Sequence, residues 1–353
     1  MAGSAQPAAP QIIRLAGRWR EEFPASPCAG LLYPAGAVFA LISAMRGWAY
    51  DRQILARHRL SVPVISLGNL TAGGTGKTPA VATLVTWLRA HGRRPAVVSR
   101  GYRAGRDGRN EEASLVGDVP VVCNPDRVAG GRRAIADGAD VLILDDGFQH
   151  RRLARDLDIL LIDATRPWGC DNGGSGRPLP AGYLREAPRQ ARRAGLLWLT
   201  RTDLVEPQRL ARLRKECADL APGVPVVEER ATGAWLTPIS GGTPMPLAAW
   251  IGRRVVLASG IGHPGALEIQ AGRLGLHVLA AVRFPDHHHF TPADAAYLLG
   301  LGRKMEAAVV ITGKDAVKLA GLPGTDSFQV LGIASSLVDP APLHGALLGL
   351  LGV

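Results

Sequence analysis

The sequence predicts an α/β protein with two units, each built on a mostly parallel sheet. From about residue 62 to residue 230, short apolar runs alternate with amphipathic stretches. A turn-rich stretch over residues 232–252 then precedes a second, shorter alternation. Strands that are buried on both faces read as short apolar runs, and the helices between them cover the sheet. The pattern therefore favours a larger α/β core followed by a smaller one.

The size and composition of the chain agree with this division. A length of 353 residues corresponds to about two domains, on a prior of ~150 residues each. Hydrophobic residues make up 47%, which is enough for a full core. We expect a basic, apolar and membrane-associated N-terminal segment over residues 1–60 and a core domain over 61–231. A hairpin linker over 232–252 and a C-terminal α/β domain over 253–353 complete the predicted order.

The charge and the cysteines restrict the partners and the compartment. A net charge of +11 indicates an anionic partner, which could be nucleic acid, acidic lipid headgroups or a phosphorylated substrate. The cysteines Cys28, Cys123, Cys170 and Cys217 lie far apart, without a C-x-x-C pair. This spacing fits neither a structural zinc site nor a disulfide framework, so we expect a reducing compartment.

The N-terminal segment contains an apolar run from Ala29 to Met45 with arginines on both sides. It begins too late for a signal peptide and shows no small-residue cleavage site. As a membrane-spanning helix it is marginal in length, contains Pro34 and gives no clear orientation. A helix in the membrane interface fits better, with each arginine gaining about 1 kcal/mol from acidic headgroups. The alternative is a helix packed on the protein's own core.

The first strand of the core leads into a glycine-rich loop. The stretch Val62–Thr83 reads as a β-branched apolar run, then Gly73, Gly74 and Gly76, then Lys77, Thr78 and a helical pattern. Strand, glycine loop, Lys-Thr and helix form the phosphate-binding arrangement of P-loop nucleotide enzymes. Glycines let successive N–H groups surround a polyanion, and the start of the helix adds positive dipole. Thr71 stands where the usual pattern has glycine, and the alternative is a glycine-rich turn that binds no nucleotide.

The remaining elements follow in order. In the core we expect strands at Pro95–Ser99, Val141–Leu144, Ile159–Asp163 and Leu196–Thr200, helices at Pro125–Asp137 and Glu206–Leu220, and a polar loop over Arg103–Gly117. In the second unit we expect strands at Val255–Ser259, His277–Phe284 and Ala308–Thr312, a helix near Pro264–Leu274, and a helix that starts at Thr291. Thr291 is a suitable N-cap because Pro292 takes the first helical position. A closing apolar segment ends the chain.

Two adjacent carboxylates close the strand before residue 147. Asp145 and Asp146 hold the position of the Walker-B aspartate, which binds Mg²⁺ directly or through water. Together with the Thr78 hydroxyl they predict a metal site beside the phosphates, where Lys77 reaches the β- and γ-phosphates. The alternative is a helix cap or a turn aspartate.

A histidine triplet follows a strand of the second unit. Asp286 precedes His287, His288 and His289, and three consecutive histidines lack the spacing of a zinc site. A general-base or substrate-binding histidine oriented by a carboxylate is chemically sensible. A solvated loop is the other interpretation. Asp118, which follows the polar loop, carries no signal by itself.

Taken together, the motifs resemble the lipid A 4′-kinases, also called tetraacyldisaccharide 4′-kinases. The matching segments appear in family order over nearly the whole chain, and Thr71 is itself usual in that family's loop. They are Gly68–Pro79, Ser99–Tyr102, Gly117-Asp118, Asp145–His150, Leu179–Gly182, Leu184–Glu186 and Phe284–His287. Two departures occur, since Val119 stands where the family commonly has glutamate and Ala187 intervenes before Pro188.

The resemblance implies ATP- and Mg²⁺-dependent phosphorylation of the 4′-hydroxyl of a tetraacylated glucosamine disaccharide 1-phosphate. It implies a P-loop kinase core and a peripheral location on the cytoplasmic face of the bacterial inner membrane. The implied partners are the acylated disaccharide lipid and an anionic membrane surface, without nucleic acid and without an obligate protein partner.

The resemblance also assigns roles to residues of this sequence. Asp118 pairs with His287 to activate the sugar hydroxyl, and Asp286 and Lys77 complete the catalytic set. The nucleotide-binding residues are Thr71, Ala72, Gly73, Gly74, Thr75, Gly76, Lys77 and Thr78. The metal-binding residues are Thr78, Asp145, Asp146 and Glu186, and the substrate-side residues are Arg100, Tyr102, Arg127 and His150.

Other P-loop functions fit the sequence less well. A membrane-associated partitioning or assembly ATPase is the strongest alternative, but it carries an additional lysine where Ala72 stands. A regulatory GTPase would read guanine with Asn-Lys-x-Asp, whereas this chain has Thr200-Arg201-Thr202-Asp203. A nucleic-acid motor would explain the charge, yet aromatic residues for base stacking are few.

Overall fold

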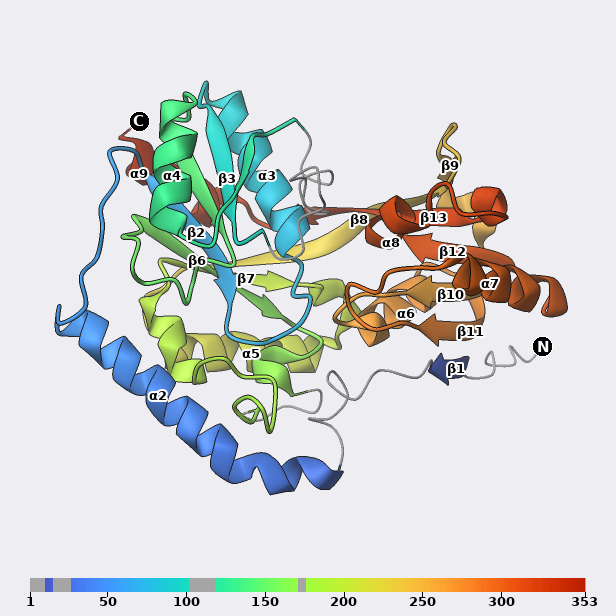
Figure 1. Ribbon diagram of the computed structural model, residues 1–353, viewed down its shortest axis with the longest axis horizontal. Helices are drawn as coiled ribbons and strands as arrows, with labels where there is room; N and C mark the ends of the chain where they lie inside the picture. Colours follow the sequence, from blue (N-terminus) through green and yellow to red (C-terminus); the bar gives the residue numbers. More distant parts are fainter. Residues whose placement is uncertain (1–9, 15–26, 102–117, 171–175, 353) are drawn as a thin grey trace. The chain divides into compact units, whose positions relative to one another are not determined.

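The computed structural model describes residues 10–14, 27–101, 118–170 and 176–352 (Figure 1). The chain divides into two compact units. One contains residues 23–230 and 336–353, and we call it the P-loop unit. The other contains residues 1–22 and 231–335, and we call it the second unit. The polar loop predicted over Arg103–Gly117 and the predicted substrate residue Tyr102 both lie outside the described residues.

The P-loop unit contains a parallel sheet in the order β8-β7-β6-β2-β5-β3-β4. Its strands are β2 (Val64–Asn69), β3 (Pro95–Ser99), β4 (Val121–Cys123), β5 (Val141–Asp145), β6 (Leu157–Asp163), β7 (Leu196–Thr200) and the first part of β8 (Val226–Pro238). Its α-helices are α2 (Tyr33–Asp51), α3 (Lys77–Ala90), α4 (Arg127–Ala136), α5 (Pro207–Leu220) and α9 (Ala341–Leu351). Short 3₁₀ helices occupy Pro27–Leu32, Pro167–Gly169, Pro188–Arg193 and Thr202–Leu204.

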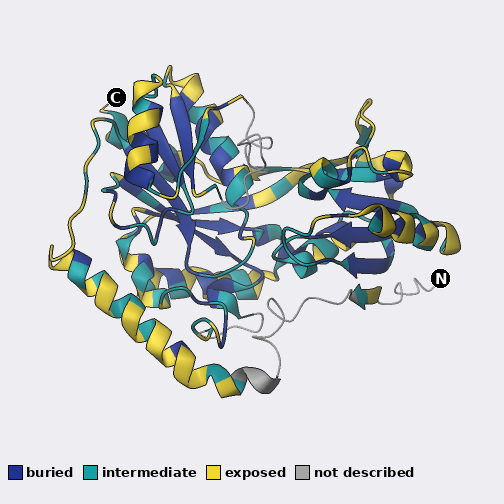
Figure 2. Cartoon of the chain, in the orientation of Figure 1, coloured by how far each residue is buried: buried dark blue, intermediate teal, exposed yellow. Residues whose placement is uncertain are grey.

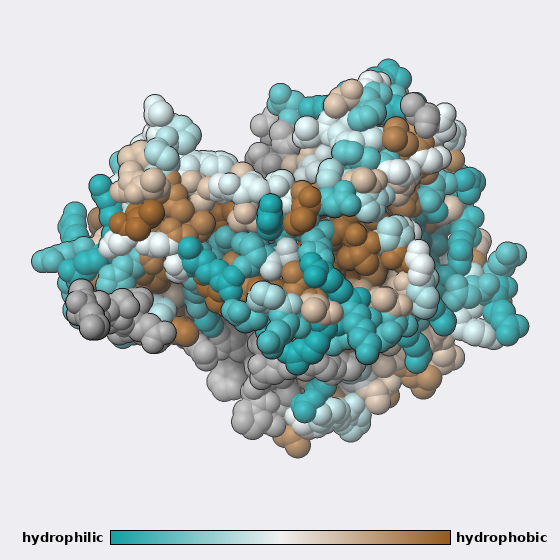
Figure 3. All heavy atoms as spheres, turned by 180° about the vertical axis from the view of Figure 1, so that it is seen from behind, coloured by the Kyte–Doolittle hydropathy of each residue, from teal (hydrophilic) through white to brown (hydrophobic). Residues whose placement is uncertain are grey.

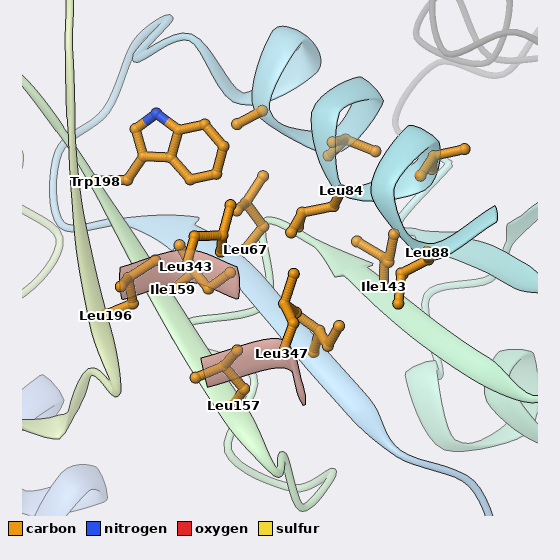
Figure 4. Close-up of a cluster of buried hydrophobic side chains, with 14 of the residues drawn as sticks. Leu67, Leu84, Leu88, Ile143, Leu157, Ile159, Leu196, Trp198, Leu343 and Leu347 are labelled. Carbon is orange, nitrogen blue, oxygen red and sulfur yellow. The ribbon is translucent and has the colours of Figure 1, made fainter. Parts of the chain in front are cut away.

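Both faces of this sheet are covered, as the apolar strands predict. Alternate residues of each strand point to opposite faces. On one face, Leu67 and Ile143 pack with Leu84 of α3 and with Leu343 and Leu347 of α9 (Figure 4). The opposite face packs against α4 and α5 in two further buried clusters. The fold class predicted for the core is therefore confirmed.

The strands of the second unit lie in the order β1-β11-β10-β12-β13-β8, and those from β1 to β13 pair in parallel. They are β1 (Gln11–Arg14), β10 (Arg254–Ser259), β11 (His277–Arg283), β12 (Ala308–Thr312) and β13 (Gln329–Leu337), with the short β9 (Met245–Pro246) antiparallel to β8. The helices are α6 (Pro264–Arg273), α7 (Pro292–Lys304) and α8 (Gly313–Leu319), with 3₁₀ turns at Leu247–Trp250 and Thr325–Ser327. Thr291 caps α7 as expected, in a reciprocal capping box with Asp294.

Several elements differ from the sequence expectation. The strands β3, β7 and β12 have the predicted bounds. The strands β1 and β4 were not predicted, because runs of four and three residues give too short a period to recognise. The closing apolar segment divides into β13 and α9, and α9 packs in the P-loop unit. The domain bounds drawn from the sequence stay predictions.

Helix α2 is the predicted apolar N-terminal helix. Among the described residues, Gly30–Asp51 is a helical stretch long and apolar enough to cross a membrane. Only Gly36 and Tyr50 of α2 are buried, and its exposed side chains include Leu41, Ile42 and Met45 (Figure 2). Elsewhere, in the view from behind, apolar residues are interspersed with polar ones (Figure 3). The alternative of a helix packed on the core is therefore wrong for most of its surface.

Candidate active site

The glycine loop lies between β2 and α3 and is held in place by the end of β7. Gly76 adopts a left-handed backbone with φ of 86°, which glycine adopts without strain. A Cβ at this position would lie 3.2 Å from Cγ2 of Thr200. The Thr200 hydroxyl donates to the Thr75 carbonyl at 3.0 Å, and Nη1 of Arg201 donates to the Gly74 carbonyl at 3.0 Å. These contacts hold the glycine loop against the end of β7.

Lys77 begins α3 and faces the carboxylate of Asp146, the residue directly after β5. Its Nζ lies 3.3 Å from Oδ1 of Asn69 and 3.7 Å from Oδ1 of Asp146. Nη1 of Arg185 contacts both carboxylate oxygens of Asp146, at 2.8 and 2.7 Å. Burial alone would raise the pKa of Asp146, but the charges of Lys77, Arg185 and Arg127 outweigh it and lower that pKa. Asp146 is therefore an ionised acceptor between cations.

Arg127 comes from the first turn of α4 and is buried behind Asp145. Its guanidinium donates to the Asn124 carbonyl at 2.9 Å and to the Asp145 carbonyl at 3.4 Å. Burial lowers the pKa of Arg127, and the nearby carboxylates of Asp145 and Asp146 oppose that effect. The predicted substrate residue thus also supports the backbone of the predicted metal site.

A cavity of about 690 Å³ lies beside Asp146 and is bounded by α2. Its apolar lining comes from Phe39, Ile42 and Leu179. Its polar and charged lining comes from Ser43, Arg46, Arg100, Arg127, Asp146, Gln149, His150, Arg185 and Glu186, with Pro125 between them. The combination of apolar wall and arginines suits an amphiphilic, anionic ligand. Three of the predicted substrate residues, Arg100, Arg127 and His150, meet at this cavity.

His150 lines the cavity as a neutral side chain. Burial lowers its pKa to about 4, and the charges of Arg127, Arg46 and Arg155 act in the same direction. Its Nε2 is buried and has no hydrogen-bond partner among the residues that the structure describes. A neutral imidazole of this kind can exchange a hydrogen bond with a ligand hydroxyl without adding charge.

Glu186 lines the same cavity but is paired with an arginine. Its carboxylate accepts from Nη2 of Arg193 at 2.5 Å, and the Arg193 guanidinium lies 4.4 Å above the Phe148 ring. Burial raises the pKa of Glu186, and Arg193 opposes this. Within the described ranges, no three His, Cys, Asp or Glu side chains cluster closely enough to hold a metal. The metal set Thr78, Asp145, Asp146 and Glu186 therefore stays a prediction.

The predicted catalytic pair is divided between the units. Asp118 belongs to the P-loop unit, is exposed, and accepts Nη2 of Arg89 on its backbone carbonyl at 3.0 Å. His287 belongs to the second unit and follows Asp286 in a turn after β11. Their pairing stays a prediction.

Sequence reasoning missed several residues that form this site. Arg185 lies in the motif Leu184–Glu186, but the sequence assigned no role to it. Of the side-chain contacts of Asp146, the one with Arg185 is shorter than the one with Lys77. Phe39, Ile42 and Arg46 were read only as parts of a membrane helix. The spacing of residues could not predict the apolar wall of the cavity, because α2 lies far along the chain from the other residues that line it.

The chain is similar to known proteins over most of its length. Residues 28–351 match the family model of the tetraacyldisaccharide-1-P 4′-kinases. A tetraacyldisaccharide 4′-kinase of Anaeromyxobacter dehalogenans strain 2CP-C is 41% identical over 327 residues, covering 85% of this chain and 84% of the relative. That of Pelobacter propionicus is 36% identical over 365 residues, covering 96% of each chain.

A solved structure is also similar. The crystal structure of LpxK from Aquifex aeolicus in complex with ATP is 30% identical and superposes with a TM-score of 0.69. The match covers 91% of this chain and 99% of the other. These similarities extend over both units and confirm the resemblance drawn from the motifs. The chain belongs to the tetraacyldisaccharide-1-phosphate 4′-kinase family.

Proposed function

We propose that this chain transfers the γ-phosphoryl group of ATP to the 4′-hydroxyl of a tetraacylated glucosamine disaccharide 1-phosphate. The observation that carries the proposal is the cavity beside Asp146, which joins an apolar wall from α2 to a cluster of arginines. An acylated, phosphorylated sugar has both chemistries. The relative solved with ATP supports that nucleotide as the donor.

The glycine loop holds the donor in this proposal. Backbone N–H groups of residues 73–77 receive the phosphate oxygens, and Lys77 contacts the γ-phosphate as charge develops on it. Lys77 rests on Asn69 and Asp146, so its ammonium group is already aimed along the loop. Positioning of this kind supplies the larger part of catalysis in phosphoryl transfer.

The oxygen donors fit Mg²⁺, which prefers carboxylate, hydroxyl and phosphate oxygens. Thr78, Asp145 and Asp146 would hold it, and Glu186 would join them only by leaving Arg193. When bound, Mg²⁺ neutralises charge on the β- and γ-phosphates. The ionised state of Asp146 supports this assignment.

Asp118 and His287 activate the acceptor. The O–H bond of the sugar hydroxyl breaks, its proton passes to this pair, and the oxygen's electrons form the bond to the γ-phosphorus while ADP leaves with the bonding electrons of the old P–O bond. A positioned base contributes ~10²–10⁴-fold to the rate. In this proposal Asp286 supports His287, and Lys77 supports the phosphates of ATP.

The acceptor is a lipid, so we place the protein at an anionic membrane surface on the cytoplasmic face of the bacterial inner membrane. The exposed apolar residues of α2 support insertion into the interface, and Arg52, which follows the end of the helix, would face acidic headgroups. Phe39 and Ile42 of this helix line the cavity, where they would contact the acyl chains.

Mass spectrometry of the reaction mixture tests the function. The disaccharide lipid is incubated with protein, ATP and Mg²⁺, and one added phosphate at the 4′ position is the expected product. The matched control omits ATP, and a second control uses Lys77→Met. Nucleotide hydrolysis that needs no lipid, or that DNA or a protein partner stimulates, would instead indicate another P-loop function.

A further inference from the structure

The turn that presents His287 is fixed by several hydrogen bonds within the second unit. His287 has a left-handed backbone with φ of 59°. Its N–H lies 3.0 Å from Oδ1 of Asp286 and 3.3 Å from the Gly260 carbonyl. Such a backbone is uncommon for histidine and persists only when its surroundings hold it. These hydrogen bonds therefore fix the backbone from which the His287 side chain extends.

Lys314, in the first turn of α8, reaches this turn from another element. Its Nζ lies 3.3 Å from Oδ1 of Asp286 and 3.5 Å from Nε2 of His287. The side chains of Lys314, His287 and Asp286 are 22%, 25% and 24% exposed, so the three form an accessible group rather than a core ion pair. Oδ2 of Asp286 lies 3.7 Å from the same Nε2.

The next residue anchors Lys314 to the turn. Asp315 is fully buried, and its Oδ2 accepts the Thr312 hydroxyl at 2.7 Å and the Gly260 N–H at 3.1 Å. Gly260 is the residue whose carbonyl faces the His287 N–H. A Cβ at Gly260 would lie 3.1 Å from Oδ1 of Asp315 and 3.2 Å from the Pro285 carbonyl, so the strands' ends are tightly joined. Asp315 thus fixes the start of α8 relative to the turn.

The chemistry of these contacts determines which ring nitrogen carries the proton. An ammonium group has three donors and no acceptor, so Nε2 of His287 can only accept from Lys314. A neutral imidazole that accepts at Nε2 carries its hydrogen on Nδ1 and donates there.

We propose that Lys314 is a positioning residue for catalysis, which holds His287 in the Nδ1–H tautomer through its contact with Nε2. The proposal rests on the proposed function. In it, His287 takes part in activating the sugar hydroxyl, and Lys314 acts only through His287.

Kinetics of Lys314→Met form the first test. We expect kcat to fall about 10- to 100-fold, a part of the ~10²–10⁴-fold that a positioned base contributes. The KM for ATP should change by less than about twofold, because the glycine loop is in the other unit. Lys314→Arg should recover a large part of kcat, since it keeps the charge and the donors. Lys304→Met, which removes an exposed lysine at the end of α7, is the matched control and should leave kcat unchanged.

Nuclear magnetic resonance of ¹⁵N-histidine-labelled protein is the second test and needs no lipid. Two-bond ¹H–¹⁵N spectra identify the protonated ring nitrogen, and His287→Gln assigns the signal. We expect hydrogen on Nδ1 in the wild type and a shift towards the other tautomer in Lys314→Met. Hydrogen on Nε2 in the wild type would overturn the proposal even if Lys314→Met failed to fold.

The two tests separate this inference from the proposed function. A wild type that forms no 4′-phosphorylated lipid would refute the proposed function. The tautomer of His287 measured by nuclear magnetic resonance would still test the role of Lys314. An active wild type with a folded, fully active Lys314→Met would refute the inference alone. Loss of kcat that Lys314→Arg does not restore in any part would also count against it.

Discussion

At the scale of single residues, the Asp118 carboxylate is where the proposed proton transfer can be measured. Asp118→Ala should lower kcat by roughly 10²-fold or more, because the sugar hydroxyl loses its base. Nucleotide affinity should stay nearly unchanged, since the glycine loop does not involve this residue. Steady-state kinetics and nucleotide titration check both, and a near-wild-type kcat would remove Asp118 from the mechanism.

His150 predicts a dependence of stability on pH. An unfolded histidine titrates near pH 6.5, whereas burial lowers the pKa of folded His150 to about 4. Between these values only the unfolded chain binds the proton, so this residue costs no stability above about pH 6.5 and destabilises increasingly as the pH falls towards 4. His150→Gln should therefore lose less stability than the wild type between about pH 7.5 and pH 5 in urea unfolding. An equal loss in both proteins would contradict the buried neutral state.

The residue scale also shows how far spacing predicts a site. Lys77, Thr78, Asp145 and Asp146 could be predicted as site residues because each follows a strand or a glycine loop at a fixed distance along the chain. Arg193 and Lys314 were not found, since their partners Glu186 and His287 give no pattern that points to them. The partner of a long, flexible cationic side chain depends on which groups the tertiary structure places within its reach.

At the scale of elements, α2 approaches the rest of the P-loop unit through a glycine. A Cβ at Gly36 would lie 3.3 Å from Cβ of Ala181 and 3.3 Å from the Pro178 carbonyl. Gly36→Val should therefore destabilise the contact by about 1–3 kcal/mol. It should also raise the KM for the lipid, because α2 supplies Phe39 and Ile42 to the cavity.

The matched control for this helix is Ala37→Val, which adds similar volume at an exposed neighbour. It should leave the KM for the lipid and the melting temperature nearly unchanged. The KM for ATP should not change in either variant. Equal effects of the two substitutions on the lipid would show that helix propensity, rather than the close approach at Gly36, sets the result.

The charge on α2 makes a further prediction about membranes. Arg52 is exposed at the end of the helix and lies over the Trp48 ring at 5.7 Å. Arg52→Gln should weaken binding to vesicles that contain anionic lipid about fivefold, corresponding to ~1 kcal/mol for one arginine near the surface. Vesicle sedimentation at low salt measures this. Arg132→Gln on α4 is the control, and an equal loss there would indicate a general charge effect rather than a role of α2.

Element prediction succeeded where a strand or helix carries its own period. The strands β3, β7 and β12 were predicted with the observed bounds, since each is a short apolar run between turn residues. β1 gives no such signal, because its four residues are stabilised by pairing with β11, which lies far along the chain. Non-local pairing of this kind is invisible in a sequence window.

At the scale of the whole molecule, the chain returns to the P-loop unit after building the second one. The last helix, α9, buries Leu343 and Leu347 against the sheet face that α3 also covers. Leu347→Ala should reduce the free energy of unfolding of this unit by about 2–5 kcal/mol. Leu348→Ala, at a partly exposed position of the same helix, should cost less. Thermal melting with and without nucleotide measures both, and equal losses would mean that α9 does not seal the core.

The division into units also explains which functional groups the sequence could bring together. Asp118 and His287 lie in different units, and only the family resemblance paired them. Within the P-loop unit, the cavity forms where α2, the residue after β5 and the loop before Glu186 meet. The spacing of residues along the chain does not predict that these segments meet. The predicted order of the units was nevertheless readable from the turn-rich stretch 232–252.

The sequence by itself determined the glycine loop, the carboxylates after β5 and the alternation that defines the fold, because covalent spacing and strand or helix period act over a few neighbouring residues. The tertiary structure alone decided that Arg185 binds Asp146, that Arg193 holds Glu186 and that Lys314 reaches His287. These pairs depend on which loops the sheet order places side by side. Packing of the whole core selects that order, and no local stretch encodes it.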